Sequence, residues 1–114
     1  MSRVVTNMDD VATILKLLGD KTRLTMMALL DNKNCCVCEL VEFFQMSQPA
    51  ISQHLRKLKD AGLLNETKKA QWVFYSVNKE HEMYSLIQDI LAHIPDQQEK
   101  LKELEEKGTR ILCE

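Results

Sequence analysis

Three cysteines within four consecutive positions are the residues of this chain best suited to chemistry. Cys35, Cys36 and Cys38 lie in the stretch NCCVCEL, and Cys113 stands one residue before the end. Clustered thiolates are soft ligands that select soft or borderline ions such as As(III), Sb(III), Cd(II), Pb(II) or Zn(II). A position ahead of a helix N-terminus lowers a thiol pKa and favours binding. The alternative is that two of the three are small core residues.

The spacing of the cysteines limits which of them can share one ion. At about 100° per residue, Cys36 and Cys38 point in nearly opposite directions on an ideal helix, whereas Cys35 and Cys38 share a face. The CVC pair therefore binds one ion only if the first turn is non-helical or unwinds. Unwinding would distort the start of the helix and disturb whatever follows it.

Apolar residues recur at helical spacing in five segments, and a further segment has the β-branched and aromatic composition of a hairpin. We expect one domain over residues 1–114, mainly α-helical with one β-hairpin, and a short charged helix after Pro95. The expected helices cover about 8–18, 22–30, 38–44, 47–61 and 82–94, and the expected strands cover 63–67 and 72–77.

Two short helices around Gln45-Met46 predict a helix-turn-helix. Ser47 is a good N-cap, and Pro49 suits the first turn of the second helix. That helix has one apolar stripe, formed by Ile51, Leu55 and Leu58. With a basic hairpin behind it, this order is typical of a winged helix-turn-helix. In that fold the second helix enters the major groove of DNA and the hairpin reaches an adjacent backbone or minor groove.

Charge is unevenly distributed along the chain. Residues 46–79 carry six Lys/Arg and two Asp/Glu, whereas residues 80–114 carry four and nine. A net charge of −2 therefore does not exclude DNA, because the local patch decides phosphate binding. Ser and Gln side chains can contact base edges. The side chains suited to phosphates are Arg56, Lys57, Lys68 and Lys69.

Three stretches resemble, in order and spacing, the ArsR/SmtB family of metal-responsive winged-helix repressors. They are LGDKTRLTMMALL, CVCELVEFFQMSQPAISQHLRKLKDAGLL and WVFYSV, and the similarity runs from about Ala12 to Ile94. The resemblance implies a homodimeric repressor that leaves its double-stranded operator DNA when a toxic metal or metalloid ion binds. The implied helix-turn-helix covers about 38–61, the wing about 63–77, and the dimerisation helices about 8–18 and 82–94.

Carried over by position, the resemblance also gives the residues that contact the operator. They are Gln48, Pro49, Ser52 and Gln53, with the N-cap Ser47 beside them. His54 belongs to the family signature, but it lies near the buried side of the helix and is expected to be structural. The wing departs from the family pattern, since Ala70 stands where the family usually has glycine. Family wings also commonly carry more basic side chains than Thr67 and Gln71 provide.

The resemblance assigns CVCEL to the sensor subgroup that binds ions at the start of the third helix, with Cys36 and Cys38 as ligands. Arsenite and antimonite sensors often add a cysteine three residues after the second, where this chain has Val41. A third sulfur would come from Cys35 or, from either protomer, Cys113. Cd/Pb sensors typically take extra cysteines from an N-terminal extension, and none precedes Cys35 here. As(III) or Sb(III) is therefore the favoured inducer, with Cd(II), Pb(II) or Zn(II) as alternatives.

Some members of that family bind Zn(II) between paired fifth helices through a D-x-H…H-x-x-E/H pattern. The matching positions here are Glu80, Glu82, His93 and Asp96. Two carboxylates replace the acid–histidine pair, and Pro95 disrupts the last spacing. A solvated or dimer-flanking His93 is therefore preferred over a ligand. The apolar stripes of the first and fifth helices exceed what the chain can bury alone, which favours a two-fold dimer on a palindromic operator.

Other classes of protein fit the sequence less well. A thiol oxidoreductase would need C-x-x-C in a βαβ setting, which CVC lacks, so we expect no enzyme. The thiols could instead sense oxidants or persulfides, or be remnants in a metal-blind DNA-binding dimer. No apolar run approaches the ~18 residues of a membrane helix. The start, MSRVVTNMDD, lacks a signal-peptide core, which predicts a cytoplasmic protein.

Overall fold

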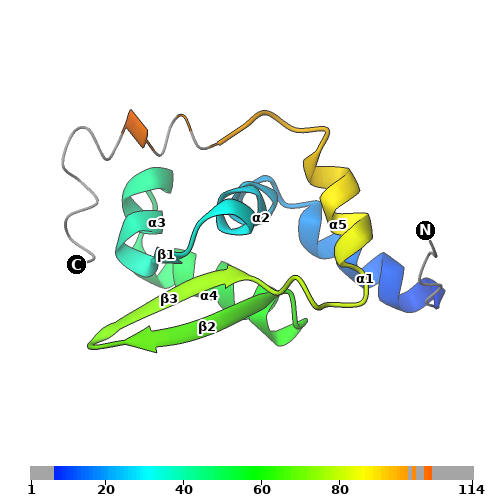
Figure 1. Cartoon of the computed structure of the whole chain (residues 1–114), viewed down its shortest axis with the longest axis horizontal. Coiled ribbons are helices and arrows are strands. Elements are labelled where there is room, and N and C mark those ends of the chain that lie inside the picture. Colours follow the sequence, from blue (N-terminus) through cyan, green and yellow to red (C-terminus); the bar gives the residue numbers. More distant parts are fainter. Residues whose placement is uncertain (1–6, 98, 100–101, 104–114) are drawn as a thin grey trace.

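The computed structural model describes residues 7–97, 99 and 102–103, and this part of the chain is mainly helical with one three-stranded antiparallel sheet (Figure 1). The order of elements confirms the predicted winged helix-turn-helix and adds one short strand. The elements are α1 Met8–Leu18, α2 Lys21–Asn32, β1 Cys35–Cys36, α3 Val37–Phe44, α4 Gln48–Asp60, β2 Leu64–Lys69, β3 Trp72–Val77 and α5 Tyr84–Leu91.

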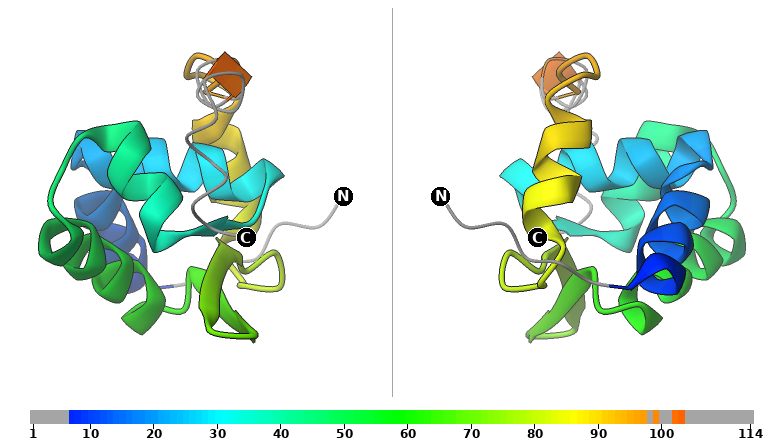
Figure 2. Two further views of the ribbon diagram at one scale, coloured as in Figure 1. Left: turned by 90° about the vertical axis from the view of Figure 1, so that its left-hand side faces the viewer. Right: turned by 90° about the vertical axis from the view of Figure 1, so that its right-hand side faces the viewer.

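Helix α2 forms the centre of the molecule and contacts α1, α4, α5 and β3. Figure 2 shows α1 and α4 on one side of α2 and α5 on the other. The fully buried side chains of α2 include Met26, Met27 and Leu29. The predicted apolar stripe of α4 is confirmed, because Ile51, Leu55 and Leu58 are at most 1% exposed. Burial of this stripe fixes which face of α4 remains available to a partner.

The sheet has the order β1-β3-β2, and its first strand was not predicted. In β1, Cys35 pairs with Tyr75 and Cys36 pairs with Phe74. Strand β2 continues to Lys69, two residues beyond the predicted end, and Lys69 pairs with Trp72. The hairpin turns at Ala70, whose φ of 57° lies in the left-handed region that glycine adopts most readily. The cysteine segment is thereby attached to the middle of β3, the central strand of the sheet.

Helix α5 is shorter than the predicted 82–94, and His81 explains its late start. The His81 Nδ1 accepts a hydrogen bond from the Met83 backbone N at 3.1 Å, and its Nε2 lies 3.3 Å from the Ala61 carbonyl oxygen. These bonds hold residues 79–83 as turns against the end of α4. Beyond Leu91 the chain tightens, since the Ile94 N donates to the Leu91 O at 3.3 Å. The helical pattern therefore ends before Pro95 is reached.

Two large apolar side chains of α1 remain exposed, Met8 at 83% and Leu15 at 52%. Cys113 and nearly all of the charged helix expected after Pro95 lie outside the described residues. Among the helices that are described, none has the length and apolar character needed to cross a membrane.

Candidate DNA interface and thiolate site

The turn between α3 and α4 has the tight geometry of a helix-turn-helix. Gln45 ends α3 in the left-handed region, with φ 54° and ψ 45°, and its N–H donates to the Val41 carbonyl oxygen at 2.9 Å. Ser47 caps α4 as expected, since its Oγ accepts from the Ala50 N at 3.3 Å. The direction of α4 is therefore fixed by backbone bonds within two residues of the end of α3.

The face of α4 opposite its buried stripe is polar and accessible. Of the residues predicted to contact the operator, Ser52 is half-buried and the others are exposed: Ser47, Gln48, Pro49, Gln53, Arg56 and Lys57. The two predicted wing lysines, Lys68 and Lys69, are exposed near the tip of the hairpin. The structure thus brings the short polar side chains to the first turns of α4 and places basic side chains on both elements.

An ion pair that sequence reasoning missed joins α4 to the wing, and a hydrogen bond to the same carboxylate joins the two wing strands. The Lys59 Nζ and the Tyr75 hydroxyl each donate to one oxygen of the Glu66 carboxylate, both at 2.9 Å. The hydrogen bond from Lys59 is the main cause that lowers the pKa of Glu66. Burial, followed by the Glu66 bond, raises the pKa of Tyr75 to about 12. Through Glu66, Lys59 thus links the last turn of α4 to β2, and Tyr75 links β2 to β3.

His54 holds α4 against the loop between α1 and α2. The Arg23 Nη1 lies 3.3 Å from the His54 Nδ1, and the Arg23 Nε donates to the Leu17 carbonyl oxygen at 2.7 Å. Because a guanidinium can only donate, the His54 Nδ1 is the acceptor in this contact. The Arg23 backbone N–H is the main cause that lowers the pKa of Asp20, the N-cap of α2.

Two of the cysteines meet at the start of α3. The Cys36 and Cys38 sulfurs are 2.8 Å apart, which is longer than the ~2.05 Å of a disulfide bond and closer than unbonded thiols usually stand. Cys36 is extended, with φ −91° and ψ 168°, and α3 begins only at Val37. The non-helical start that the pair requires is therefore already present, and no unwinding is needed to bring the two sulfurs together.

A buried carboxylate fixes the backbone at this point. Glu39 is 4% exposed, and its Oε1 accepts from the Cys36 backbone N at 3.0 Å. The two residues form a capping box, in which the Cys36 sulfur faces the Glu39 backbone N–H. That N–H belongs to the positive end of α3, which stabilises a thiolate. The spacing C-x-x-E was the sequence signal for this box, and sequence reasoning missed it.

Cys35 lies apart from the sulfur pair. Its side chain is 0% exposed and belongs to the hydrophobic core, with Sγ 3.7 Å from the Lys33 carbonyl oxygen. Successive side chains of a strand point to opposite faces, so Cys35 and Cys36 diverge. Among the described residues, no three His, Cys, Asp or Glu are grouped to hold one metal ion. The structure therefore does not bring the predicted third ligand Cys35 to Cys36 and Cys38, and Cys113 is not described.

A cavity of about 430 Å³ opens beside the two sulfurs. Its lining is mainly apolar and comes from Cys36 of β1 and from three further elements. From α3 it takes Val41 and Glu42, from α4 its first residue Gln48, and from β3 Trp72 and Val73. Sequence reasoning missed this cavity because no single element contains it. Both elements expected to touch DNA, α4 and the wing, therefore contribute to the space next to the thiols.

Comparison with known proteins identifies the family. Residues 20–66 match the model described as "Bacterial regulatory protein, arsR family". The arsenic resistance transcriptional regulator ArsR1 of Pseudomonas putida is 43% identical over 59% of this chain, which spans only 53% of that relative. The arsenical resistance operon repressor of Staphylococcus aureus is 34% identical over 75% of this chain and 77% of its own length. The chain belongs to the ArsR family.

A solved structure with this fold agrees with the assignment. HlyU from Vibrio cholerae superimposes with a TM-score of 0.67, is 32% identical, and covers 76% of this chain and 94% of its own. The ArsR family consists of DNA-binding transcriptional regulators, and this member is a regulator rather than an enzyme.

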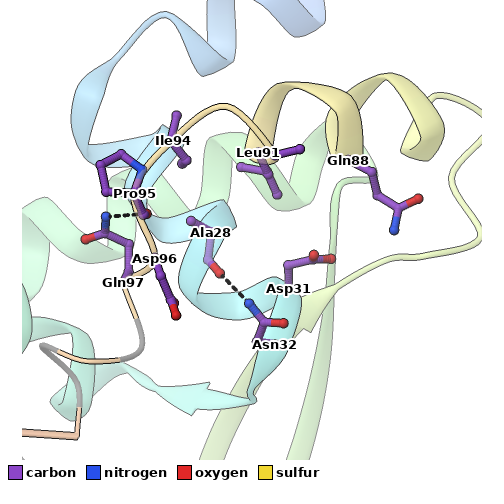
Figure 3. A pocket seen from close by; sticks show the side chains of 10 residues that line it. Ala28, Asp31, Asn32, Gln88, Leu91, Ile94, Pro95, Asp96 and Gln97 are labelled. Atoms are coloured by element: carbon purple, nitrogen blue, oxygen red, sulfur yellow. Dashed lines mark hydrogen bonds between the residues drawn. The ribbon is translucent and has the colours of Figure 1, made fainter.

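The second metal site predicted for an ArsR-family protein is not assembled within one chain. Glu80 and Glu82 are exposed in the turns before α5, whereas His93 and Asp96 follow its end. Asp96 lines a separate cavity of about 300 Å³ between α2 and α5 (Figure 3). Asp31, which also lines this cavity, accepts a hydrogen bond from the Tyr84 hydroxyl at 2.6 Å, and this bond ties α5 to α2. A site shared by two protomers stays a prediction.

Proposed function

We propose that this ArsR-family regulator is a homodimeric repressor that releases operator DNA when As(III) or Sb(III) binds Cys36 and Cys38. The observation that carries the proposal is the pair of sulfurs 2.8 Å apart at the start of α3, one short helix before the DNA-facing helix. Thiolates favour such soft ions. The names of the Pseudomonas and Staphylococcus relatives, both concerned with arsenic resistance, favour arsenic among them.

On the DNA side, α4 enters the major groove with Gln48, Ser52 and Gln53 facing base edges. Arg56, Lys57 and the two wing lysines contact phosphates, which positions the protein without reading sequence. Pairing of two chains through α1 and α5 presents two copies of α4 to the half-sites of a palindrome. A repressor of this kind acts where the chromosome is, in the cytoplasm.

The coupling between ion and DNA follows from what surrounds the thiols. Because the pair is assembled before ligation, unwinding of α3 is not the transmitting event. The ion instead opens the sulfur pair beside Gln48 and Trp72, at the junction of α4 and the wing. A coupling free energy of about 1–3 kcal/mol is enough to shift the dimer off its operator. Cys113, from either protomer, stays a candidate third ligand.

The test is DNA release by the reduced full-length protein. Fluorescence anisotropy with DNA from upstream of its own gene is followed during titration with As(III), Cd(II) and Zn(II). We expect As(III) to release the DNA, and Cys36→Ser and Cys38→Ser to bind DNA normally but not to release it. Gln53→Ala is the matched DNA-side variant and should weaken binding by about 1–3 kcal/mol without changing the response to As(III).

Other results of the titration would change or refute the proposed function. Release mainly by Zn(II), with the cysteine variants still responding, would assign sensing to the positions Glu80, Glu82, His93 and Asp96. Release mainly by Cd(II) or Pb(II) would keep the site and change the ion. Wild-type protein that never binds the DNA would refute the proposed function.

A second candidate inducer is an oxidant, and the same sulfur distance favours it. Two adjacent thiols can form a disulfide, losing two protons and two electrons to a peroxide; hydrogen peroxide is reduced to two waters, and an alkyl hydroperoxide to an alcohol and one water. Peroxide would then release the DNA with the loss of two titratable thiols, and dithiothreitol would restore binding. No release at thiol-oxidising concentrations would exclude this candidate.

A further inference from the structure

The guanidinium of Arg23 joins three helices at one point. Arg23 lies in the first turn of α2, and its Nε donates to the carbonyl oxygen of Leu17, in the last turn of α1, at 2.7 Å. Its Nη1 lies 3.3 Å from the Nδ1 of His54 on α4 and 3.9 Å from the Oδ2 of Asp20. The Arg23 side chain is only 12% exposed. It therefore orients the imidazole of His54 while offering little surface of its own to a partner.

The other ring nitrogen of His54 is open to solvent. Among the described residues, no group forms a hydrogen bond with Nε2, whereas every buried side-chain nitrogen or oxygen there has a hydrogen-bond partner. Nε2 is therefore not a buried atom. When Nδ1 accepts from Arg23, the single proton of a neutral imidazole is on Nε2. The contact with Arg23 thus favours an accessible N–H donor on α4.

The place of His54 on α4 decides what such a donor would meet. At about 100° per residue, His54 stands about 100° around the helix from Gln53 and about 60° from the exposed Lys57. With Gln53 facing base edges on the floor of the major groove, His54 lies on the flank of the helix. The walls of the groove are the phosphate backbones, which take most hydrogen bonds from proteins. A donor on this flank therefore faces a phosphate oxygen.

We propose that His54 donates its Nε2–H to a backbone phosphate of the operator, and that Arg23 is the positioning residue that holds the imidazole in the orientation and tautomer this contact needs. The inference rests on the docking of α4 in the proposed function and is independent of the cysteines. It makes the junction between α1 and α2 part of the DNA interface, although Arg23 itself does not touch DNA.

Substitution can separate this contact from a purely structural role. A structural His54 needs only Nδ1, whereas the phosphate contact needs Nε2. Asparagine carries its amide oxygen close to the position of Nδ1 and can still accept from Arg23, but it does not reach the position of Nε2. Glutamine places its amide nitrogen close to Nε2 and can still donate to a phosphate. His54→Asn should therefore keep the fold and lose DNA affinity, and His54→Gln should recover most of that affinity.

The first experiment measures the operator affinity of the full chain by fluorescence anisotropy, with DNA from upstream of its own gene. We expect His54→Asn to raise the dissociation constant about tenfold, which corresponds to 1.4 kcal/mol. Arg23→Lys keeps the positive charge but loses the planar fork that holds Leu17 and His54 together, so it should weaken binding by a similar factor. The double variant Arg23→Lys/His54→Asn should bind as tightly as His54→Asn alone, because Arg23 acts through His54.

Two further measurements identify the proton and the phosphate. Nitrogen–proton correlation spectra of the histidine rings, assigned by the signals that His54→Asn removes, should show the proton on Nε2 in the free and the DNA-bound protein. In Arg23→Lys the proton should be shared between the two ring nitrogens. Upstream duplexes in which one phosphate at a time is replaced by a neutral methylphosphonate should include a position that weakens the wild type but weakens His54→Asn no further. Urea denaturation should show equal stability for the wild type and His54→Asn.

The outcomes separate this inference from the proposed function. Wild-type affinity in His54→Asn, a His54→Gln protein that binds no better than His54→Asn, or a proton on Nδ1 would overturn the inference and leave an arsenic-responsive repressor standing. A loss of affinity in His54→Asn that no single methylphosphonate abolishes would also overturn it. Wild-type protein that binds DNA but is not released by As(III) would refute the proposed inducer and leave the phosphate contact intact. Absence of DNA binding by the wild type would refute both.

Discussion

At the scale of single residues, Glu39 organises the thiolate site. It is the buried charged residue of the described chain, and it accepts a hydrogen bond from the backbone of Cys36 at 3.0 Å. That bond keeps Cys36 extended at the edge of α3 and so directs its sulfur toward Cys38. The position of this carboxylate in the first turn of α3 offsets the cost of burying it.

Removal of this carboxylate should therefore destabilise both the fold and the site. We expect Glu39→Ala to lower the free energy of unfolding by about 1–3 kcal/mol, because the buried Cys36 N–H loses its acceptor. Glu39→Gln keeps an oxygen acceptor and should retain most of the stability. Glu42→Ala, on the same helix, should change it by less than about 0.5 kcal/mol. Urea denaturation measures all three, and equal values for the two alanine variants would contradict the role given to Glu39.

At the scale of elements, the sequence predicted what periodicity encodes and missed what tertiary contacts decide. The stripe of Ile51, Leu55 and Leu58 predicted α4 and its buried face correctly, because three turns give a clear period. Strand β1 has two residues and no period, so nothing in the sequence distinguished it from a loop. The start of α5 depends on His81 reaching Ala61 across the chain, which spacing alone does not reveal.

The same distinction, between what sequence spacing encodes and what tertiary contacts decide, holds for the candidate site. The spacing C-V-C predicted Cys36 and Cys38 as ligands, a role that stays a prediction, and helix geometry gave the requirement for a non-helical turn, which the extended Cys36 meets. The exclusion of Cys35 from the pair, however, follows from the pairing of β1 with β3, which points its side chain into the core. The cavity needs α3, α4 and β3 in contact, so its walls at Gln48 and Trp72 could not be found before the fold.

The link that Glu66 makes with Tyr75 between the two long wing strands, β2 and β3, should be visible in an alkaline titration. In a Tyr84→Phe background, Glu66→Gln should bring the pKa of Tyr75 down from about 12 yet keep it above 10.0, because burial is the larger cause. Ultraviolet absorbance of tyrosinate measures it. Since the folded pKa exceeds the unfolded one, the associated stability is complete below about pH 10. It is lost as the pH rises toward about 12, and an unchanged Tyr75 pKa in the Glu66 variant would contradict the link.

At the scale of the whole molecule, the apolar surface and the DNA-facing surface lie on different elements. The wing extends toward one end of the molecule, and α1 and α5 lie toward the other (Figure 1). Exposed Leu15 and Met8 on α1 mark the surface that we assign to pairing. Because pairing and DNA contact are assigned to different elements, a dimer can form without covering α4. The thiol cavity of each chain then stays between α3 and the wing.

A charge on the pairing surface should therefore weaken the dimer without unfolding the protein. We expect Leu15→Glu to raise the dimer dissociation constant by about tenfold or more, or 1.4 kcal/mol, because it puts a carboxylate into an apolar contact. Lys16→Glu, the exposed neighbour, is the control and should have little effect. Sedimentation equilibrium measures both. A Leu15→Glu protein that dimerises like the wild type would move the interface away from this part of α1.

The N-cap of α3 is Cys36, and this choice of residue sets the stability of the fold against the response to an inducer. Serine, aspartate and asparagine are the preferred residues at an N-cap, and cysteine is a weaker choice. Cys36→Ser should thus give a protein at least as resistant to unfolding as the parent. It should no longer release DNA in the presence of arsenic. Selection for stability alone would favour serine at this position. Under the proposed function, the cysteine is maintained only while the cell gains from sensing arsenic, and its exchange for serine would turn an inducible repressor into one that never leaves its operator.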